Sequence, residues 1–273
     1  MSKTRLFAAI KSLDVDAVSA LLDAHPELAR AKDERRRNPL HFVCGLPVSD
    51  ETLPRSLALG RLLLDRGLDV NEPAFLEEGG AFKATPLWYA LSRGRNLPLA
   101  KLLLKRGSSP EYCLWTAGFH DDVKAIDLLV KAGARLDPVV EDETPFLSAI
   151  KWSRFKAAER LLRHGANANF QNSKGMTALH ALVKKHSERR HLELLLRHGA
   201  DPTLRDAKGV SPLDMVARRR DKTLFHLFST RASWPRTRRP GDPASVAAPD
   251  AGGGVPSIAP VVGPLVPCPK APG

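Results

Sequence analysis

The chain has 273 residues, of which 43% are hydrophobic and 26% are charged. This balance excludes a mostly disordered chain, because it supplies enough apolar side chains for a core. Lysine and arginine number 42 against 30 aspartates and glutamates, a formal net charge of +12, which favours acidic proteins, nucleic acids or anionic membranes as partners. The three cysteines, Cys44, Cys113 and Cys268, lie far apart. This spacing excludes a disulfide framework and a Cys-x-x-Cys zinc site, and it fits a reducing compartment.

No segment predicts a secretory signal or a membrane span. The apolar run from Leu6 to Ile10 is too short for the core of a signal peptide, and Lys11 follows it directly. The long uncharged stretch at 251–269 contains five prolines, which would deprive a membrane helix of backbone donors. We therefore expect a cytoplasmic protein, or one that is secreted without a typical signal peptide.

The composition changes near residue 230. Ten of the 22 prolines and six of the 19 glycines follow this point, where Leu265 is the only leucine. Such a composition cannot build a packed core. The sequence predicts a folded part at 1–230 and a disordered tail at 231–273, which is basic at its start and then rich in Pro, Gly and Ala.

The folded part repeats itself with a period of about 33 residues. Five segments share a similar start: Asn-Pro-Leu-His at 38–41, Thr-Pro-Leu-Trp at 85–88, Thr-Pro-Phe-Leu at 144–147, Thr-Ala-Leu-His at 177–180 and Ser-Pro-Leu-Asp at 211–214. Five leucine-rich segments end in a glycine: Gly67, Gly107, Gly133, Gly165 and Gly199. This double marker indicates a regular structural unit.

Each marker has a physical meaning. A threonine before proline can cap the first turn of a helix, and proline tolerates the first helical position because its missing N–H would have no partner there. The leucines belong to a second helix, and the glycine suits the left-handed conformation that ends it. Such a helix pair exposes apolar surface on both flanks, so it is stable only when stacked on neighbours.

The starts and the period resemble those of ankyrin repeats, whose hallmark is Thr-Pro-Leu-His-x-Ala. The resemblance implies an all-α solenoid of about seven stacked helix-turn-helix units with protruding loops. The expected units are 3–34, 35–72, 82–110, 111–140, 141–173, 174–207 and 208–230. The first unit would pair 6–10 with 18–22 as a cap.

Three segments depart from the repeat. An insertion at 45–54 should lengthen the turn between the helices of the second unit, and residues 72–84 exceed a normal loop between repeats. The fourth unit has no Thr-Pro start, and 112–117 aligns only through Leu114 and Ala117. We expect its first helix to fray or the stack to shift there.

No catalytic, cofactor-binding or metal site is predicted. The resemblance implies that His41 and His180 are structural hydrogen-bonding residues, since no cysteine or carboxylate accompanies them at ligand spacing. His-Ser-Glu-Arg-Arg-His at 186–191 is a weak zinc candidate. A Gly-x-Ser-x-Gly elbow is absent from the sequence, and Cys44 is expected to pack as a small apolar residue. We therefore expect no enzyme and no cofactor.

The resemblance also implies a concave groove lined by the first helices and the loop tips. The groove candidates, at the ends of the first helices, are Arg93, Phe119, His120, Lys151, Trp152, Lys184, Lys185, Arg218 and Arg219, with Ser92 beside Arg93. Between residues 184 and 239, 15 lysines and arginines face six acids, so basic charge concentrates in the last two units and the start of the tail. Trp and Arg dominate interface hot spots.

Two functions fit these features. The first is a non-catalytic, monomeric protein–protein interaction module or scaffold that binds an acidic segment of a partner in its groove. The alternative is binding of nucleic acid or anionic lipid through the basic C-terminal repeats and tail, which salt should weaken steeply. A solvated charged face without a function would show the same composition.

Overall fold

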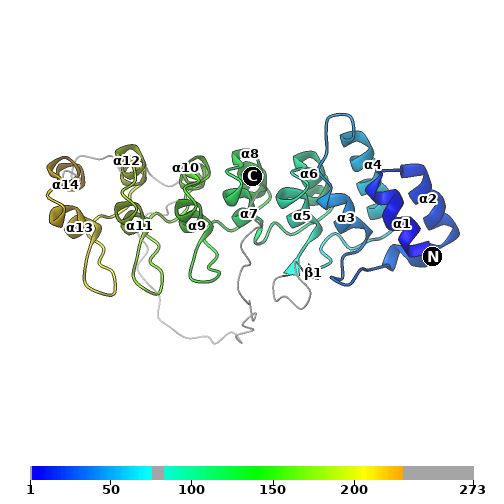
Figure 1. Ribbon diagram of the computed structural model, residues 1–273, viewed down its shortest axis with the longest axis horizontal. Coiled ribbons are helices and arrows are strands. Elements are labelled where there is room, and N and C mark those ends of the chain that lie inside the picture. Colours follow the sequence, from blue (N-terminus) through cyan, green and yellow to red (C-terminus); the bar gives the residue numbers. More distant parts are fainter. Residues whose placement is uncertain (1, 76–82, 230–273) are drawn as a thin grey trace, which may run out of the picture. The chain divides into compact units, whose positions relative to one another are not determined.

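The computed structural model describes residues 2–75 and 83–229 (Figure 1). The predicted disordered tail at 231–273 lies outside these residues. The contacts divide the described chain into unit 1, residues 2–135, and unit 2, residues 136–229. Each unit is described by itself.

Unit 1 contains four consecutive helix pairs. The pairs are α1 (Ser2–Lys11) with α2 (Val15–Ala24), α3 (Pro39–Gly45) with α4 (Leu53–Asp65), α5 (Pro86–Ser92) with α6 (Leu97–Lys105), and α7 (Cys113–Phe119) with α8 (Val123–Lys131). The first helices pack on one another in the order α1, α3, α5, α7, and the second helices α2, α4 and α6 pack likewise. A 3-10 helix, η1 (Pro26–Arg30), follows α2. Two short antiparallel strands, β1 (Ala74–Phe75) and β2 (Lys83–Ala84), precede α5.

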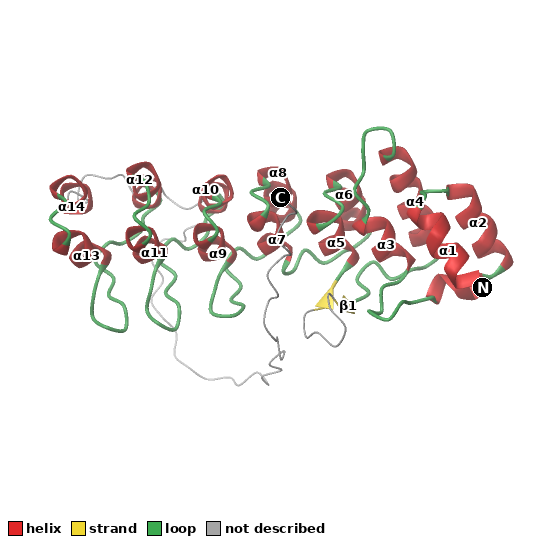
Figure 2. Cartoon of the chain, in the orientation of Figure 1, coloured by secondary structure: helices red, strands yellow, loops and turns green. Residues whose placement is uncertain are grey.

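Unit 2 continues the pattern with three pairs. They are α9 (Pro145–Lys151) with α10 (Phe155–Arg163), α11 (Ala178–Lys184) with α12 (Arg189–Arg197), and α13 (Pro212–Arg218) with α14 (Lys222–Ser229). Within this unit α9, α11 and α13 form one layer and α10, α12 and α14 a second, and long loops project from the side of the first helices (Figure 2). The described residues thus confirm the predicted all-α fold of stacked helix pairs, with four pairs in unit 1 and three in unit 2.

The starts of the first helices are capped as predicted. Asn38, Thr85, Thr144, Thr177 and Ser211 each accept a hydrogen bond from the backbone N–H three residues further on. Proline occupies the first helical position in four of these five helices. The cap and the proline together fix where each unit begins.

The second helices end at glycines in the left-handed conformation, as the sequence predicted. Gly165 and Gly199 have φ values of 99° and 84°. The N–H of Gly199 donates to the carbonyl of Leu196, and the N–H of Ala200 donates to that of Leu195, both at 3.0 Å. This Schellman pattern satisfies carbonyls that would otherwise lack partners, and it turns the chain sharply into the next loop.

The tight turns inside the helix pairs use a conformation that the sequence pattern did not indicate. Asp121, Ser153, His186 and Arg220 all have φ between 54° and 57° although none is glycine. One left-handed residue at this point reverses the chain within three or four residues. Its cost is one to a few kcal/mol at each position, which the packing of the two helices must offset.

The core of unit 2 lies between the two layers and between successive pairs. Leu161 and Leu195 on the second helices, and Ile150 and Leu182 on the first, have no exposed surface. A polar tie joins neighbouring repeats: the Asn169 amide donates to the Gly199 carbonyl at 2.9 Å and accepts from the Asp201 N–H at 2.6 Å. Successive units are therefore joined by apolar packing and by backbone-directed hydrogen bonds.

Two departures from the repeat are present, and a third expectation is wrong. The insertion does separate α3 from α4, and the long segment before α5 carries the strand pair. The first helix of the fourth pair, however, is regular, because α7 spans Cys113–Phe119 and packs on both α5 and α8. Tyr112 starts it in a left-handed conformation, with φ of 62° and no side-chain cap. Burial of Cys113, Leu114 and Ala117 replaces the missing Thr-Pro start.

The described helices are all short, and none combines the length and the apolar character that a bilayer crossing requires.

Replacing Leu161 or Leu195 with alanine should lower the free energy of unfolding by about 2–5 kcal/mol, because each change leaves a cavity between stacked pairs. Urea denaturation followed by circular dichroism measures this loss. Lys156→Ala on the exposed surface of α10 is the matched control and should change stability little. Equal effects of the three changes would contradict the assigned core.

Candidate functional site

The predicted groove residues occupy equivalent places in the repeats. In unit 2, Lys151, Lys184 and Arg218 are the last residues of α9, α11 and α13, and Trp152, Lys185 and Arg219 are the C-caps that follow them. In unit 1, Arg93 is the C-cap of α5, Phe119 is the last residue of α7, and His120 is its C-cap. All nine residues thus lie at the same end of the first helices.

We call the six positions in unit 2 the basic row: Lys151, Trp152, Lys184, Lys185, Arg218 and Arg219. All six side chains are exposed, and the Trp152 side chain keeps 50% of its surface accessible. The Lys185 ammonium donates to the carbonyl oxygen of Lys151 in the preceding repeat. Because α9 packs on α11 and α11 on α13, the row runs continuously across the three first helices.

The charges of the basic row are less compensated than those on the second helices. Arg163 pairs with Glu159 at 2.5 Å, and Arg189 and Arg197 both pair with Glu193 of their own helix. In contrast, Lys184, Arg218 and Arg219 form no salt bridge with any described carboxylate. Lys151 is the exception within the row, because its ammonium pairs with Glu143. The cations of the basic row other than Lys151 therefore have no described carboxylate within salt-bridge distance.

Helix electrostatics account for part of this pattern. Carbonyl groups at a helix C-terminus carry partial negative charge, so lysine and arginine are favourable there at about 0.3–1 kcal/mol each. A structural role of this kind explains one cation per helix end. It leaves unexplained the second cation at Lys185 and Arg219 and the exposed indole of Trp152.

The candidates in unit 1 are only partly available to a partner. Arg93 is exposed, with its guanidinium carbon 5.8 Å from the centre of the Tyr89 ring. Phe119 and His120 are half-buried and pack edge to face, with ring centres 5.3 Å apart. Ser92 is buried rather than groove-facing, which corrects the prediction, because α5 turns that position into the packed side.

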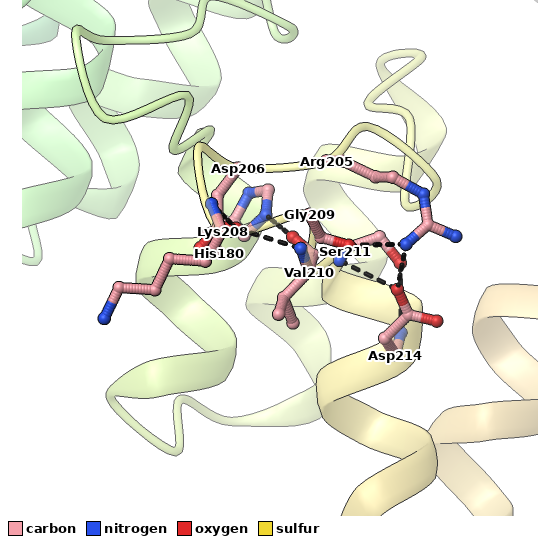
Figure 3. Close-up of polar contacts among 8 residues, drawn as sticks. All are labelled: His180, Arg205, Asp206, Lys208, Gly209, Val210, Ser211 and Asp214. Carbon is pink, nitrogen blue, oxygen red and sulfur yellow. Dashed lines mark hydrogen bonds and ion pairs between the residues drawn. The ribbon is translucent and has the colours of Figure 1, made fainter.

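The loop between α12 and α13 is held by carboxylates (Figure 3). Asp206 accepts hydrogen bonds from the backbone N–H groups of Val210, at 3.0 Å, and Lys208, at 2.9 Å, and these bonds keep the pKa of Asp206 below its usual value. Asp214 accepts from the Ser211 N–H at 3.0 Å, which lowers the pKa of Asp214 in the same way. Arg205 bridges the Gly209 carbonyl and Asp214. This loop is therefore ordered by its own side chains.

The two histidines of the repeat start are structural, as the resemblance implied. In His180, Nδ1 accepts from the Thr177 N–H at 3.0 Å while Nε2 lies 3.0 Å from the Val210 carbonyl of the next loop (Figure 3). His41 repeats the cap, with Nδ1 accepting from the Asn38 N–H at 3.2 Å. Burial lowers the pKa of His41 from 6.5 to about 4, so this ring is neutral near pH 7.

The zinc candidate at 186–191 has other contacts in the structure. His186 Nδ1 lies 3.3 Å from the Arg219 guanidinium, and the His191 ring stacks on Phe155 with 3.4 Å between the ring centres. Across 2–75 and 83–229, no three His, Cys, Asp or Glu side chains gather where they could hold a metal ion. The sequence pattern did not indicate the stacking of Phe155 on His191, because it joins two second helices that are 36 residues apart.

The described cysteines match the interpretation of Cys44 as a packing residue. Cys44 and Cys113 are both fully buried. Burial raises the pKa of both thiols, that of Cys113 to about 12, so both remain protonated and unreactive near pH 7. Cys268 lies outside the described residues.

Comparison with known proteins gives the class of the fold. Residues 114–206 match the family model of ankyrin repeats, in three copies. The ankyrin repeat domain of human ASB11 superposes with a TM-score of 0.63 and 23% identity, covering 88% of this chain and 99% of that one. The ankyrin repeat domain of Bcl-3, a member of the IκB protein family, superposes with a TM-score of 0.59 and 22% identity over 77% of this chain and 92% of that one. No curated protein sequence matches the chain.

Residues 114–206 thus match ankyrin repeats, and the described chain has the fold of an ankyrin repeat domain. The repeats recognised by the family model run from α7 to the loop after α12, and the likeness to the two solved structures extends the fold well beyond them. Ankyrin-repeat domains are generally protein–protein interaction modules.

Because His41 is buried, the protein should become less stable as the pH is lowered below 6.5. Between pH 6.5 and about 4 the unfolded chain binds a proton at this ring and the folded chain does not, so the free energy of unfolding decreases as the pH is lowered through this range. The full effect corresponds to roughly 3 kcal/mol. Urea denaturation of the wild type and His41→Gln across this range measures it. Parallel pH profiles of the two proteins would contradict the account.

The exposure of Trp152 predicts that Trp152→Ala changes the free energy of unfolding by less than about 0.5 kcal/mol. Phe146→Ala, in the same helix pair but at a position that is 1% exposed, is the matched control and should cost about 3–5 kcal/mol. Thermal unfolding of the two variants compares them directly. A large loss of stability in Trp152→Ala would move Trp152 into the core and out of the candidate surface.

Proposed function

We propose that this chain is a non-catalytic interaction module that binds an acidic segment of another protein along the basic row. The observation that carries the proposal is the contrast in unit 2 between paired and unpaired cations. Arginines on α10 and α12 form salt bridges with glutamates four residues away, whereas Lys184, Arg218 and Arg219 form none with a described carboxylate. A partner that supplies carboxylates would complete these ion pairs.

Trp152 gives the surface an anchor for apolar contact. Its half-exposed side chain lies at the end of α9, where the basic row begins, next to Lys151. Lys185 lies one repeat further along the row. An indole flanked by cations favours a segment in which an aromatic or aliphatic side chain accompanies the acids. Rim charges set the association rate, and the buried anchor sets the lifetime of the complex.

The proposed module is expected to act as a monomer in the cytoplasm, without a cofactor. Arg93, Phe119 and His120 lie at the corresponding helix ends of unit 1, and they are proposed as contact residues of that unit. The boundaries of the seven units that were given from the sequence also remain predictions.

The double charge reversal Lys184→Glu/Arg219→Glu should weaken binding of an acidic peptide that contains tryptophan by at least about tenfold, because it replaces attraction with repulsion at two adjacent repeats. Lys156→Glu/Lys208→Glu is the control, since both side chains are exposed and the change in net charge is the same. Isothermal titration calorimetry at moderate ionic strength measures both dissociation constants. Equal weakening by the two pairs would show that only net charge matters and would overturn the assignment to the row.

A titration with salt separates the proposal from the nucleic-acid and lipid alternative. Binding of a single-stranded RNA or of phosphatidylserine vesicles through phosphates should fall steeply with salt, whereas a contact anchored on Trp152 should fall less. Tight binding of RNA or vesicles that is lost in Lys184→Glu/Arg219→Glu but kept in Trp152→Ala would favour the alternative.

A further inference from the structure

Three residues of the basic row share one backbone geometry. Trp152, Lys185 and Arg219 directly follow α9, α11 and α13, with φ values of −89°, −79° and −78° and ψ values of 7°, 0° and −7°. A left-handed residue follows each of them in the turn. Because the backbone fixes the direction of the Cα–Cβ bond, these side chains leave their helix ends in equivalent directions. We call these three residues, one indole and two cations, the cap line.

Both cations of the cap line reach back to the preceding repeat. The Lys185 ammonium donates to the carbonyl oxygen of Lys151, and the Arg219 guanidinium lies 3.3 Å from Nδ1 of His186. These contacts join residues that are 34 and 33 positions apart. Neither contact involves a carboxylate, so both groups keep their positive charge. A long side chain held near its charged end loses less freedom when a partner binds, and it presents its charge at a defined place.

The cap line advances by one helix spacing per repeat. The three first helices α9, α11 and α13 pack side by side in this order (Figure 2). Helices packed in this way lie about 8–10 Å apart. A partner segment that contacts Trp152, Lys185 and Arg219 in turn must therefore present one suitable side chain at each step of this length.

The step matches the repeat of a polyproline II helix. This conformation has three residues per turn and a rise of about 3.1 Å, so residues three apart lie on one edge at intervals of about 9.3 Å. In a β-strand, the residues on one face follow at intervals of about 6.6 Å, and every second one at about 13 Å. Neither spacing of the strand fits the step.

We infer that the partner segment is extended, in the polyproline II conformation, with an apolar residue and two acids spaced three residues apart. This inference rests on the proposed function of the basic row as a site for an acidic segment. The apolar side chain covers Trp152, the nearer acid pairs with Lys185, and the farther acid pairs with Arg219. Such a segment needs no sheet edge, and its conformation is already populated before binding, which lowers the cost of ordering it.

An α-helical segment fits the same step only with a different sequence. Residues seven apart on a helix are separated by about 10.5 Å. The segment would need about 15 residues to cover both steps, a length at which an isolated helix is marginal in water. The two conformations therefore require different acid spacings, and peptides can tell them apart.

Peptides of one composition test the spacing. The first is Leu-Pro-Pro-Glu-Pro-Pro-Glu with blocked ends, and the second has the same residues in reverse order. In the control peptides, Leu-Glu-Glu-Pro-Pro-Pro-Pro and its reverse, the two glutamates are adjacent. Fluorescence anisotropy of labelled peptides with the intact chain at low ionic strength measures the affinities. We expect the better of the first two peptides to bind at least about fivefold more tightly than either control, because only this spacing places both acids opposite anchored cations.

A double-mutant cycle assigns each acid to its cation. Replacing the glutamate farther from leucine with glutamine should weaken binding to the wild type several-fold and leave binding to Arg219→Gln unchanged. The nearer glutamate should be coupled in the same way to Lys185→Gln. Lys156→Gln, on the exposed surface of α10, is the control and should keep the preference of the wild type for both acids. Circular dichroism verifies that each variant retains its helices.

Equal affinity for both spacings, with binding still lost in Lys184→Glu/Arg219→Glu, would overturn the inference and leave the proposed function intact. Tighter binding of a helical peptide with leucine and two glutamates at intervals of seven residues would overturn it likewise. Failure of every acidic peptide to bind, including the one that contains tryptophan, would overturn the proposed function and this inference together.

Discussion

The structure depends on the burial of apolar surface between neighbouring helix pairs. A pair such as α11 and α12 buries leucines towards the pair before it and the pair after it, so neither flank is satisfied by the pair alone. Capping hydrogen bonds, left-handed glycines and the Asn169 tie determine the geometry of this packing. Their individual contributions, about 1 kcal/mol each, are small beside the cost of ordering some 30 residues per repeat. Stacking therefore decides whether any one pair is folded.

This constraint also places the candidate binding surface. Because the flanks and the space between the layers are used for packing, the side chains that do not pack lie at the helix ends and in the loops. The basic row lies at one such end and recurs because the repeat recurs. Residues separated by 33 or 34 positions in the sequence, such as Lys151 and Lys185, become neighbours that share a hydrogen bond. A binding surface of this kind is assembled from many local positions, none of which is a site by itself.

Much of the fold was predictable from local chemistry. Thr144 and Gly165 each have one dominant local role, cap and left-handed stop, so their recurrence located the helices correctly. The same reasoning predicted that α7 would fray or that the stack would shift there, because the Thr-Pro cap is missing and the burial of Cys113 and Leu114 is not evident from the sequence. The left-handed turns at Ser153 and His186 escaped for a related reason. Non-glycine residues adopt that conformation only where packing imposes it, and the packing around a residue cannot be inferred from the identity of that residue alone.

The surface was less predictable than the core. The equivalence of repeats located the ends of the first helices, but it could not tell exposed Arg93 from buried Ser92, one residue earlier. The pairing of cations depended on helix bounds: Arg189 and Glu193, four residues apart, share one helix and form a salt bridge, whereas α11 ends at Lys184, before the glutamate four residues further on. The 43% exposure of Phe225 was also not predictable, because it depends on α14 being the last helix of the described residues. Each of these features depends on where a helix ends or on what lies across a repeat boundary.

Hydrogen exchange of the intact chain carrying Leu195→Ala tests the dependence on stacking most directly, because Leu195 is buried in the middle pair of unit 2. The account predicts that amide protection falls in α11 and α12 and also in α9, α10, α13 and α14, since those pairs lose part of their shared interface. Loss of protection confined to α11 and α12, with the neighbouring pairs as protected as in the wild type, would contradict it.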